Sequence, residues 1–293
     1  MDNHTVLLGD NLKKLKTIER GTVDLTFLDP PFNQQKEYAC FDDNLPEKEY
    51  WEMMQNVCKQ IFDLTVEGGC IYFMQREKNA EFVLNVLRES GWTFHNLIIW
   101  KKLTSAVPVR GKYGKQFQII VYAVKGKQAK TFNRLRINPP MPVNYKFKRE
   151  NGIYVTDVWD DVREMTSGYF AGDEAIRTIE GERFHKQQTP IALLLRIILT
   201  STNIGDTVLD PYSGTGTTAI TALQLIRNSI SIEIDPQNVK CIENRISNIR
   251  TADNIQKYYQ NYACTENLSK IWGNFYNETI QQELNIGLFK KVI

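Results

Sequence analysis

The chain has 293 residues, of which 42% are hydrophobic and 24% are charged, and its formal net charge is only +2. No apolar run approaches the roughly 20 residues that a membrane span requires, and the first residues lack the basic and apolar pattern of a signal peptide. We therefore expect a soluble globular protein of the cytoplasm without a membrane partner.

The cysteine and histidine content argues against a metal site. Five cysteines are present, none in a Cys-x-x-Cys pair, and only three histidines could assist them as ligands. An odd number of cysteines in a protein expected inside the cell is typical of reduced thiols that pack as small hydrophobic side chains. We therefore predict that no metal is bound.

Apolar periodicity predicts short strands that alternate with helices. Strands are expected at Val23–Leu28, 70–74, 97–100, 119–124, 207–209 and 229–234. Helices are expected at Glu47–Leu64, 191–202 and 219–226, and after Asp235-Pro236, which suit an N-cap and the first helical position. The alternation predicts an α/β fold, a three-layer Rossmann-like mixed sheet that binds ligands at the carboxyl ends of its strands.

A tetrapeptide with two prolines, Asp29-Pro30-Pro31-Phe32, directly follows the first of these strands. The prolines fix φ and remove two N–H donors, so we expect rigid carbonyl groups that are unpaired by local secondary structure. An aspartate carboxylate beside such a carbonyl suits an amino group with two hydrogens, and the phenylalanine ring offers a face for stacking. The alternative interpretation is a turn stiffened by proline.

Residues 101–149 are strongly cationic, because they hold thirteen of the 36 lysines and arginines and none of the 34 aspartates and glutamates. Tyrosines and phenylalanines are interleaved with them, a mixture typical of a surface that neutralises phosphates and stacks on bases. A solvated basic face is the alternative. The residues that we assign to nucleic-acid contacts are Lys101, Lys102, Arg110, Lys112, Lys115, Arg134 and Arg136.

The alternation of strands and helices stops between residues 128 and 184, where Asn-Pro-Pro-Met-Pro at 138–142 blocks regular structure. Because a chain of this length suits one large core with an added module, we interpret residues 128–184 as an insertion. The core then comprises residues 1–127 and 185–250. Residues 251–293 are expected to form a partly helical extension, to which the sequence assigns no role.

A glycine-bearing turn is predicted at residues 210–218, which read Asp-Pro-Tyr-Ser-Gly-Thr-Gly-Thr-Thr between a strand and a helix. Glycine permits the tight bend, and the exposed N–H groups at the helix start attract a carboxylate or phosphate. The segment is neither Gly-x-Gly-x-x-Gly nor a loop ending in Gly-Lys-Ser/Thr, which disfavours dinucleotide and nucleoside-triphosphate binding. Glu233 closes the next strand, about 20 residues on, where it could accept from ribose hydroxyls. The alternative is a tight structural turn.

Together these segments resemble the amino methyltransferases of bacterial DNA, which modify adenine N6 or cytosine N4. The resemblance spans residues 6–250 and rests on Gly-Asp at 9–10, the Asp-Pro-Pro-Phe loop, His-Lys-Gln-Gln-Thr-Pro at 185–190, and the segment 210–218. The chain departs from the family at Thr189, where lysine is commoner, and at Tyr212, which replaces phenylalanine. The order of the loops resembles the beta subgroup, whose target-recognition region lies between them, where this chain has its predicted insertion.

The resemblance implies a fold of the S-adenosylmethionine-dependent methyltransferase type, S-adenosylmethionine as cofactor, and double-stranded DNA with a flipped-out base as partner. The implied catalytic residues are Asp29, Pro30, Pro31 and Phe32. The implied cofactor contacts are Asp10, Asp29, Thr189, Pro190, Asp210, Tyr212, Ser213, Gly214, Thr215, Gly216, Thr217 and Glu233. A restriction-modification role is implied, while a homodimer and a separately encoded restriction endonuclease stay open.

Several substrates are compatible with these motifs. Adenine N6 is favoured because the loop begins with Asp29, whereas many relatives that act on cytosine N4 have serine there. RNA or a protein glutamine amide is a further alternative, although the related loops usually begin with asparagine. An inactive DNA-binding relative is disfavoured because Asp29 and Asp210 are both present.

Overall fold

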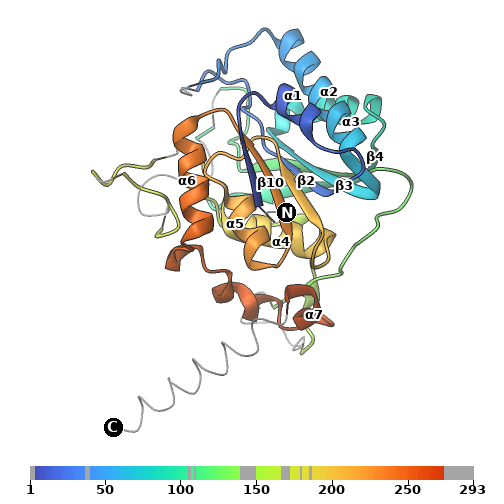
Figure 1. The fold of residues 1–293 in the computed structure, drawn as a ribbon, viewed down its shortest axis with the longest axis vertical. Coiled ribbons are helices and arrows are strands. Elements are labelled where there is room, and N and C mark those ends of the chain that lie inside the picture. Colours follow the sequence, from blue (N-terminus) through green and yellow to red (C-terminus); the bar gives the residue numbers. More distant parts are fainter. Residues whose placement is uncertain are drawn as a thin grey trace.

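An eight-stranded mixed sheet, in the order β1-β10-β9-β2-β3-β5-β4-β8, organises the chain in the computed structural model (Figure 1). The structure describes residues 4–36, 40–104, 107–108, 110–138, 150–165, 172–178, 180–184 and 187–273. The sheet strands are β1 (His4–Leu8), β2 (Val23–Leu28), β3 (Thr65–Gln75), β4 (Thr93–Lys101), β5 (Phe117–Val124), β8 (Val158–Trp159), β9 (Thr207–Asp210) and β10 (Asn228–Glu233). Strand β5 runs antiparallel to both of its neighbours, and the other pairs are parallel.

Helices cover both faces of the sheet. They are α1 (Asn11–Lys14), α2 (Glu47–Leu64), α3 (Ala80–Glu89), α4 (Ile191–Ser201), α5 (Thr217–Gln224) and α6 (Pro236–Ser247), followed by α7 (Leu268–Trp272). Short 3-10 turns are η1 (Leu15–Thr17), η2 (Glu77–Asn79), η4 (Thr251–Asp253) and η5 (Ile255–Tyr262). Figure 1 shows α1, α2 and α3 on one side of the sheet and α4, α5 and α6 on the other. The predicted three-layer α/β fold is therefore confirmed.

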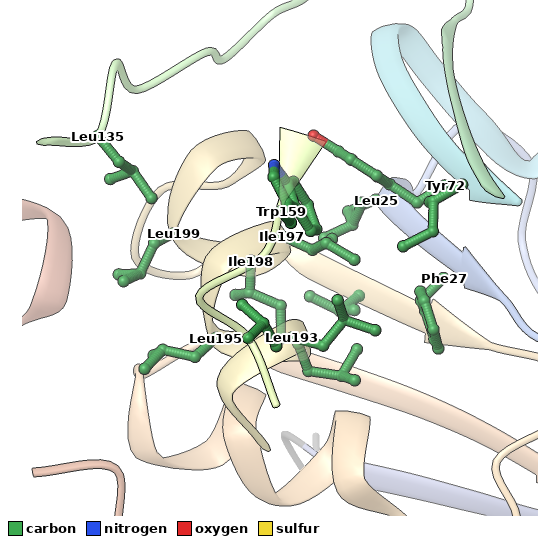
Figure 2. Close-up of a cluster of buried hydrophobic side chains, with 14 of the residues drawn as sticks. Leu25, Phe27, Tyr72, Leu135, Trp159, Leu193, Leu195, Ile197, Ile198 and Leu199 are labelled. Carbon is green, nitrogen blue, oxygen red and sulfur yellow. The ribbon is translucent and has the colours of Figure 1, made fainter. Parts of the chain in front are cut away.

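The two faces of β3 belong to two separate hydrophobic clusters. Cys70, Tyr72 and Met74 pack with α4, whereas Ile71 and Phe73 pack with α2. Successive side chains of a strand point to opposite faces, so a strand between two helical layers must be apolar at every position. This is why the central strands are continuous apolar runs in the sequence. In Figure 2 the side chains of α4 lie against those of β2 in one of these clusters.

All six predicted strands are present, and helix α2 has the predicted bounds. Helix α6 begins after Asp235, whose side chain accepts from Gln237 N as a true N-cap. The sequence interpretation did not include β1 or α3. Strand β1 lies at the sheet edge and is only partly buried, so its apolar signal is weak.

The predicted insertion contributes directly to the main core. Strand β8 extends the main sheet beside β4, and Trp159 and Val162 pack in the same cluster as α4 (Figure 2). The Arg196 guanidinium of α4, almost fully buried, pairs with the Asp161 carboxylate through both of its terminal nitrogens. A short antiparallel pair, β6 (Arg136–Ile137) and β7 (Ile153–Tyr154), forms the rest of its regular structure in the described ranges. The domain boundaries themselves stay a prediction.

The extension after α6 is partly helical over its described residues, with η4, η5 and α7 joined by turns, and the residues beyond 273 lie outside the described ranges. Trp272 is fully buried and packs with the α4 cluster. The described residues include no helix long and apolar enough to cross a membrane.

Candidate active site

A cavity of about 1610 Å³ opens where strands β1, β2, β9 and β10 end. Both Asp29, after β2, and Asp210, at the end of β9, line it. Sites for a single small ligand are usually about 300–1,000 Å³, so this cavity has room for two ligands side by side. Neighbouring parallel strands end at the same edge of a sheet, which is why loops about 180 residues apart in the chain meet here.

Asp29 is held at the base of this cavity by a residue from the other half of the chain. Thr189 Oγ1 donates to Asp29 Oδ2 at 3.1 Å. The pKa of Asp29 is raised to about 7, mainly by burial; the Thr189 hydrogen bond lowers it, and the charge of Asp210 contributes to the increase. A carboxyl group that titrates near neutrality in a cleft is typical of a functional site.

The carbonyls of the Asp-Pro-Pro-Phe loop differ in their pairing. Tyr50 Oη donates to the Pro31 carbonyl at 2.7 Å, and Gln75 Nε2 donates to Tyr50 Oη at 2.9 Å. The prediction that bonds of local secondary structure leave these carbonyls unpaired holds for Pro30 and Pro31 among the described residues, but the Pro31 carbonyl is occupied by a side chain of α2. Within the described residues, no donor bonds the Pro30 carbonyl.

The Phe32 ring lines the cavity but is only 9% exposed. Most of its surface packs in the hydrophobic cluster that includes Met74 and Trp100. A small part of the ring is therefore left for contact with a ligand.

Asp210 organises the glycine-bearing turn. Its Oδ2 accepts from Thr218 Oγ1 at 2.5 Å, and its Oδ1 accepts from Tyr212 N at 3.0 Å. Burial raises the pKa of Asp210 to about 7. Gly216 has φ +79°, and a Cβ there would lie 2.8 Å from the side chain of Ile242, so both conformation and space require glycine.

Glu233 ties this turn to β10. Its Oε2 accepts from Gly214 N at 2.8 Å and its Oε1 accepts from Asp235 N at 2.9 Å. Each carboxylate oxygen has a second lone pair, so these bonds leave capacity for a ligand hydroxyl. Among the described residues, no acceptor bonds the N–H groups of Thr215 and Thr217, and free N–H groups at a helix start favour an anion.

The cavity brings together nearly all residues predicted from the sequence. All four catalytic candidates line it, as do all predicted cofactor contacts except Pro190 and Gly216. Pro190 precedes α4 and Gly216 precedes α5, so both shape the site through the backbone. Asp10 lines the cavity and also caps α1, accepting from Lys13 N at 3.1 Å.

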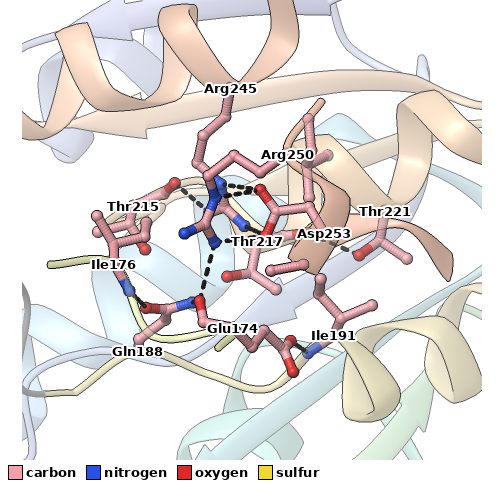
Figure 3. Close-up of polar contacts among 12 residues, drawn as sticks. Glu174, Ile176, Gln188, Ile191, Thr215, Thr217, Thr221, Arg245, Arg250 and Asp253 are labelled. Atoms are coloured by element: carbon pink, nitrogen blue, oxygen red, sulfur yellow. Dashed lines mark hydrogen bonds and ion pairs between the residues drawn. The ribbon is translucent and has the colours of Figure 1, made fainter. Parts of the chain in front are cut away.

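The turn at 210–218 is supported from behind by the extension after α6, as Figure 3 shows. Arg245 Nη1 donates to the Thr215 carbonyl at 2.5 Å. The fully buried Asp253 accepts from Arg245 Nη2 at 2.9 Å and from Arg250 Nη2 at 2.6 Å. Through Arg245 of α6, this network connects residues 251–253 to the turn, a long-range contact that no local sequence pattern indicates.

The predicted nucleic-acid contacts do not form one surface. Of the seven, only Lys102 lines the cavity; burial lowers its pKa to about 7, while the carboxylates of Glu164 and Asp29 oppose this. On the surface, Lys101 pairs with Asp160, and Lys115 pairs with Glu77.

Arg134 and Arg136 lie at the other end of the sheet. Strand β5 runs antiparallel to β3, so the chain after Val124 leaves at the amino ends of the parallel strands. There Lys130 Nζ bonds Asp24 at 2.6 Å and Asp206 at 3.1 Å, near the starts of β2 and β9. Figure 1 places the turns and helix α7 that follow α6 at this end, and Arg136 N bonds Thr265 Oγ1 there.

Several cavity residues were not identified from the sequence. Among them are Asn11, Lys36, Met74, Trp100, Gln118 and Glu164. Met74 and Trp100 lie near the ends of β3 and β4, so the strand order would have indicated these two. No group of His, Cys, Asp and Glu side chains that could hold a metal ion occurs among the residues described.

Known proteins match most of the chain. Residues 23–244 match a family described as DNA methylase. The chain is 31% identical over 255 residues to the DNA adenine methyltransferase YhdJ of Escherichia coli (strain K12), with 80% of each protein covered. It is 28% identical over 242 residues to the type II methyltransferase M.HpaI of Haemophilus parainfluenzae, covering 82% of this chain and 73% of that protein.

Solved structures share the fold at lower identity. The PvuII DNA methyltransferase, which is cytosine-N4-specific, gives a TM-score of 0.61 at 16% identity and covers 92% of this chain and 93% of that one. The complex of M1.HpyAVI with SAM gives a TM-score of 0.56 at 21% identity, and the match covers 83% of this chain and 98% of that one. At these identities the structural likeness concerns the fold.

Proposed function

This chain belongs to the DNA methylase family, and on that premise we propose that it transfers a methyl group from S-adenosylmethionine to the N6 amino group of adenine in double-stranded DNA. The observation that carries the proposal is that Asp29 and Asp210 line one cavity, the first beside a free carbonyl and the second beside free backbone N–H groups. Adenine is preferred over cytosine because the catalytic loop begins with aspartate.

The residues around Asp210 fit S-adenosylmethionine. The free N–H groups of Thr215 and Thr217 suit its carboxylate, and Glu233 suits its ribose hydroxyls. Asp10 lies on the same side of the cavity, where it could accept from the adenine edge. The donor supplies a methyl group activated by a positively charged sulfonium.

The loop that begins at Asp29 fits the amino group of the base. An exocyclic amino nitrogen is a poor nucleophile because its lone pair is delocalised into the ring. When Asp29 and the Pro30 carbonyl accept its two hydrogens, the nitrogen becomes more tetrahedral and its lone pair is directed along one line. The turn headed by Asp210, which lines the same cavity, would hold the methyl donor.

Methyl transfer moves positive charge onto the amino nitrogen next to Asp29. The new N–C bond forms as the S–C bond breaks, and the proton that the nitrogen then loses passes to solvent. An ionised Asp29 stabilises this charge, so the carboxylate and not the carboxylic acid is the active form. The amino group and its acceptor are only a few angstroms apart, so a small displacement of either group weakens this stabilisation strongly.

The amino group of a base inside a duplex is out of reach of such a buried loop. The base must leave the stack, at a cost of a few kcal/mol, and contacts to phosphates would offset this cost. The base-flipping step is part of the proposal, as are a homodimer and a separately encoded restriction endonuclease.

Incubation with labelled S-adenosylmethionine and unmethylated DNA, followed by digestion to nucleosides, tests the proposal. We expect label in N6-methyladenine, and the Asp29→Ala variant should lose at least about a hundredfold in rate while binding S-adenosylhomocysteine within a few fold. Label in N4-methylcytosine would reassign the base. Transfer to RNA alone, or full activity of Asp29→Ala, would contradict the proposed function.

A further inference from the structure

Two hydroxyl groups flank the catalytic loop, and each donates to one of its acceptor oxygens. We propose, on the basis of the function above, that Thr189 and Tyr50 are positioning residues. By occupying Asp29 Oδ2 and the Pro31 carbonyl, they leave Asp29 Oδ1 and the Pro30 carbonyl to accept the two hydrogens of the amino group.

The Thr189 contact fixes the rotation of the carboxylate. The terminal torsion of an aspartate is broad, so a carboxylate without a partner samples many orientations. Thr189 Oγ1 holds Oδ2 at 3.1 Å, and within the described residues no donor bonds Oδ1. One oxygen is therefore anchored to the protein, and the other is available to the base.

Thr189 is placed for this contact by the start of α4. It stands two residues before Ile191, the first residue of the helix, whose N–H bonds the buried Glu174 carboxylate at 2.5 Å. The preceding Gln188 is also buried and bonds the Glu174 carbonyl and Ile176 N, as Figure 3 shows. The hydroxyl therefore reaches the catalytic carboxylate from a segment that is fixed on both sides.

Threonine at this position adds no charge beside Asp29, on which the charges of Asp210, Lys102 and Lys36 act. Where the family commonly has lysine, this chain has a neutral donor. A hydroxyl orients the carboxylate without forming an ion pair, and the pKa of Asp29 is about 7, with burial as the main cause. The contact lowers that pKa, so its removal should move the pKa upward.

The Tyr50 contact fixes the other side of the loop. Tyr50 is 1% exposed, belongs to the core face of α2, and is itself held by the fully buried Gln75. Its bond to the Pro31 carbonyl sets ψ of Pro31, while the proline rings already restrict φ at positions 30 and 31. The Pro30 carbonyl between these fixed points has no protein donor in the described part of the chain.

Hydroxyl-deletion variants test both contacts. Thr189→Val and Tyr50→Phe keep the side-chain volume and remove one donor each. Thr65→Val and Tyr72→Phe are matched controls, because Thr65 bonds the Ile61 carbonyl and Tyr72 bonds Ser201, both away from the cavity. All four are compared by thermal melting, by Kd for S-adenosylhomocysteine, and by single-turnover methylation across pH.

We expect Thr189→Val and Tyr50→Phe to lower the methylation rate about tenfold or more, while the Kd for S-adenosylhomocysteine stays within a few fold of the wild-type value. Thr189→Ser, which keeps the hydroxyl, should have the wild-type methylation rate. In Thr189→Val the acidic limb of the rate profile should also move to higher pH, whereas in Tyr50→Phe it should not move. Rates at every pH equal to those of the two controls would overturn the proposal.

The Thr189 contact can also be measured without any methylation. This measurement tests the contact separately from the proposed function. In protein labelled with ¹³C at aspartate carboxyls, the Asp29 signal is assigned with Asp29→Asn and titrated. A higher pKa in Thr189→Val, and a wild-type value in Thr189→Ser, supports the contact. An unchanged Asp29 pKa in Thr189→Val would overturn it, whether or not DNA is methylated.

Discussion

The Asp29 and Asp210 carboxyl groups lie in one cavity, and the charge of Asp210 raises the pKa of Asp29. Asp210 is buried and Asp29 is half-buried, and each has a pKa raised to about 7 with desolvation as the main cause. The two aspartates end neighbouring strands, β2 and β9, that pair directly in the sheet. Both carboxyl groups therefore change charge over the same range of pH.

Methylation should fall steeply below about pH 7. When Asp29 is protonated, one of its oxygens donates a hydrogen bond instead of accepting one. The neutral group also no longer stabilises the positive charge on the amino nitrogen. With saturating S-adenosylmethionine, which removes the contribution of Asp210 to cofactor binding, we expect about a tenfold loss for each pH unit below the pKa. A rate that stays constant down to pH 5 would show that Asp29 ionises normally.

Replacement of Asp29 by asparagine should stabilise the protein at alkaline pH. The pKa of Asp29 is about 7 in the folded state and 3.8 for an ordinary exposed aspartate, so the folded state binds more protons between these values. Stability is therefore lost as pH rises from about 4 to 7, because burial disfavours the charge, and a neutral amide avoids this loss. We expect Asp29→Asn to raise the free energy of unfolding at pH 8 by on the order of 1 kcal/mol. The gain in free energy of unfolding should be smaller at pH 4. An equal gain at pH 4 and pH 8 would contradict this prediction.

The local features of the site could be read from the sequence, because each depends on neighbouring residues. Asp29 and Asp210 both follow an apolar strand, and Gly216 stands where a strand-to-helix turn needs positive φ. The contacts that hold these loops could not be predicted. Thr189 lies 160 residues from Asp29, and Tyr50 lies in a helix whose bounds were predicted but not its contact with the loop.

Strand direction explains why the described part of the basic segment, residues 101–149, does not form a single surface. Composition shows only that residues 101–149 are cationic. Because β5 is antiparallel, the described residues just before it lie at the carboxyl ends of the parallel strands, and the described residues that follow it, up to residue 138, lie at the amino ends. The direction of one strand therefore divides a run of charge that is continuous in the sequence.

Gly216→Ala should be more damaging than Gly205→Ala. Both glycines have positive φ, +79° and +83°, so both substitutions introduce similar backbone strain. Only at Gly216 would the new Cβ meet another atom, in Ile242, at 2.8 Å. We expect Gly216→Ala to lose on the order of 2 kcal/mol more in chemical denaturation, and to bind S-adenosylhomocysteine more weakly in calorimetry. Equal losses would show that Ile242 moves aside freely.

Asp253→Ala should destabilise the protein and weaken cofactor binding. The variant leaves Arg245 buried without its carboxylate partner, and removal of one partner from a buried ion pair commonly costs about 3–5 kcal/mol. Arg245 also bonds the Thr215 carbonyl, so the turn at 210–218 should lose support. The exposed pair of Asp160 with Lys101 is the control, and Asp160→Ala should cost at most about 1 kcal/mol. Similar melting temperatures for the two variants would exclude this role for Asp253.

DNA affinity should depend more on basic residues before β5 than on those after it. Arg110 and Lys112 are exposed in the connection from β4 to β5, at the end of the sheet that carries the cavity, whereas Arg134 and Arg136 follow β5. Each lost phosphate contact should reduce the slope of log K against log salt by about 0.9. We expect the double variant Arg110→Ala, Lys112→Ala to reduce the slope by about 2, and Arg134→Ala, Arg136→Ala to reduce it by less than half as much. Fluorescence anisotropy with duplex DNA at several salt concentrations measures both slopes. A larger effect of the second pair would mean that DNA extends to the amino ends of the strands, because Arg134 and Arg136 could contact phosphates only there.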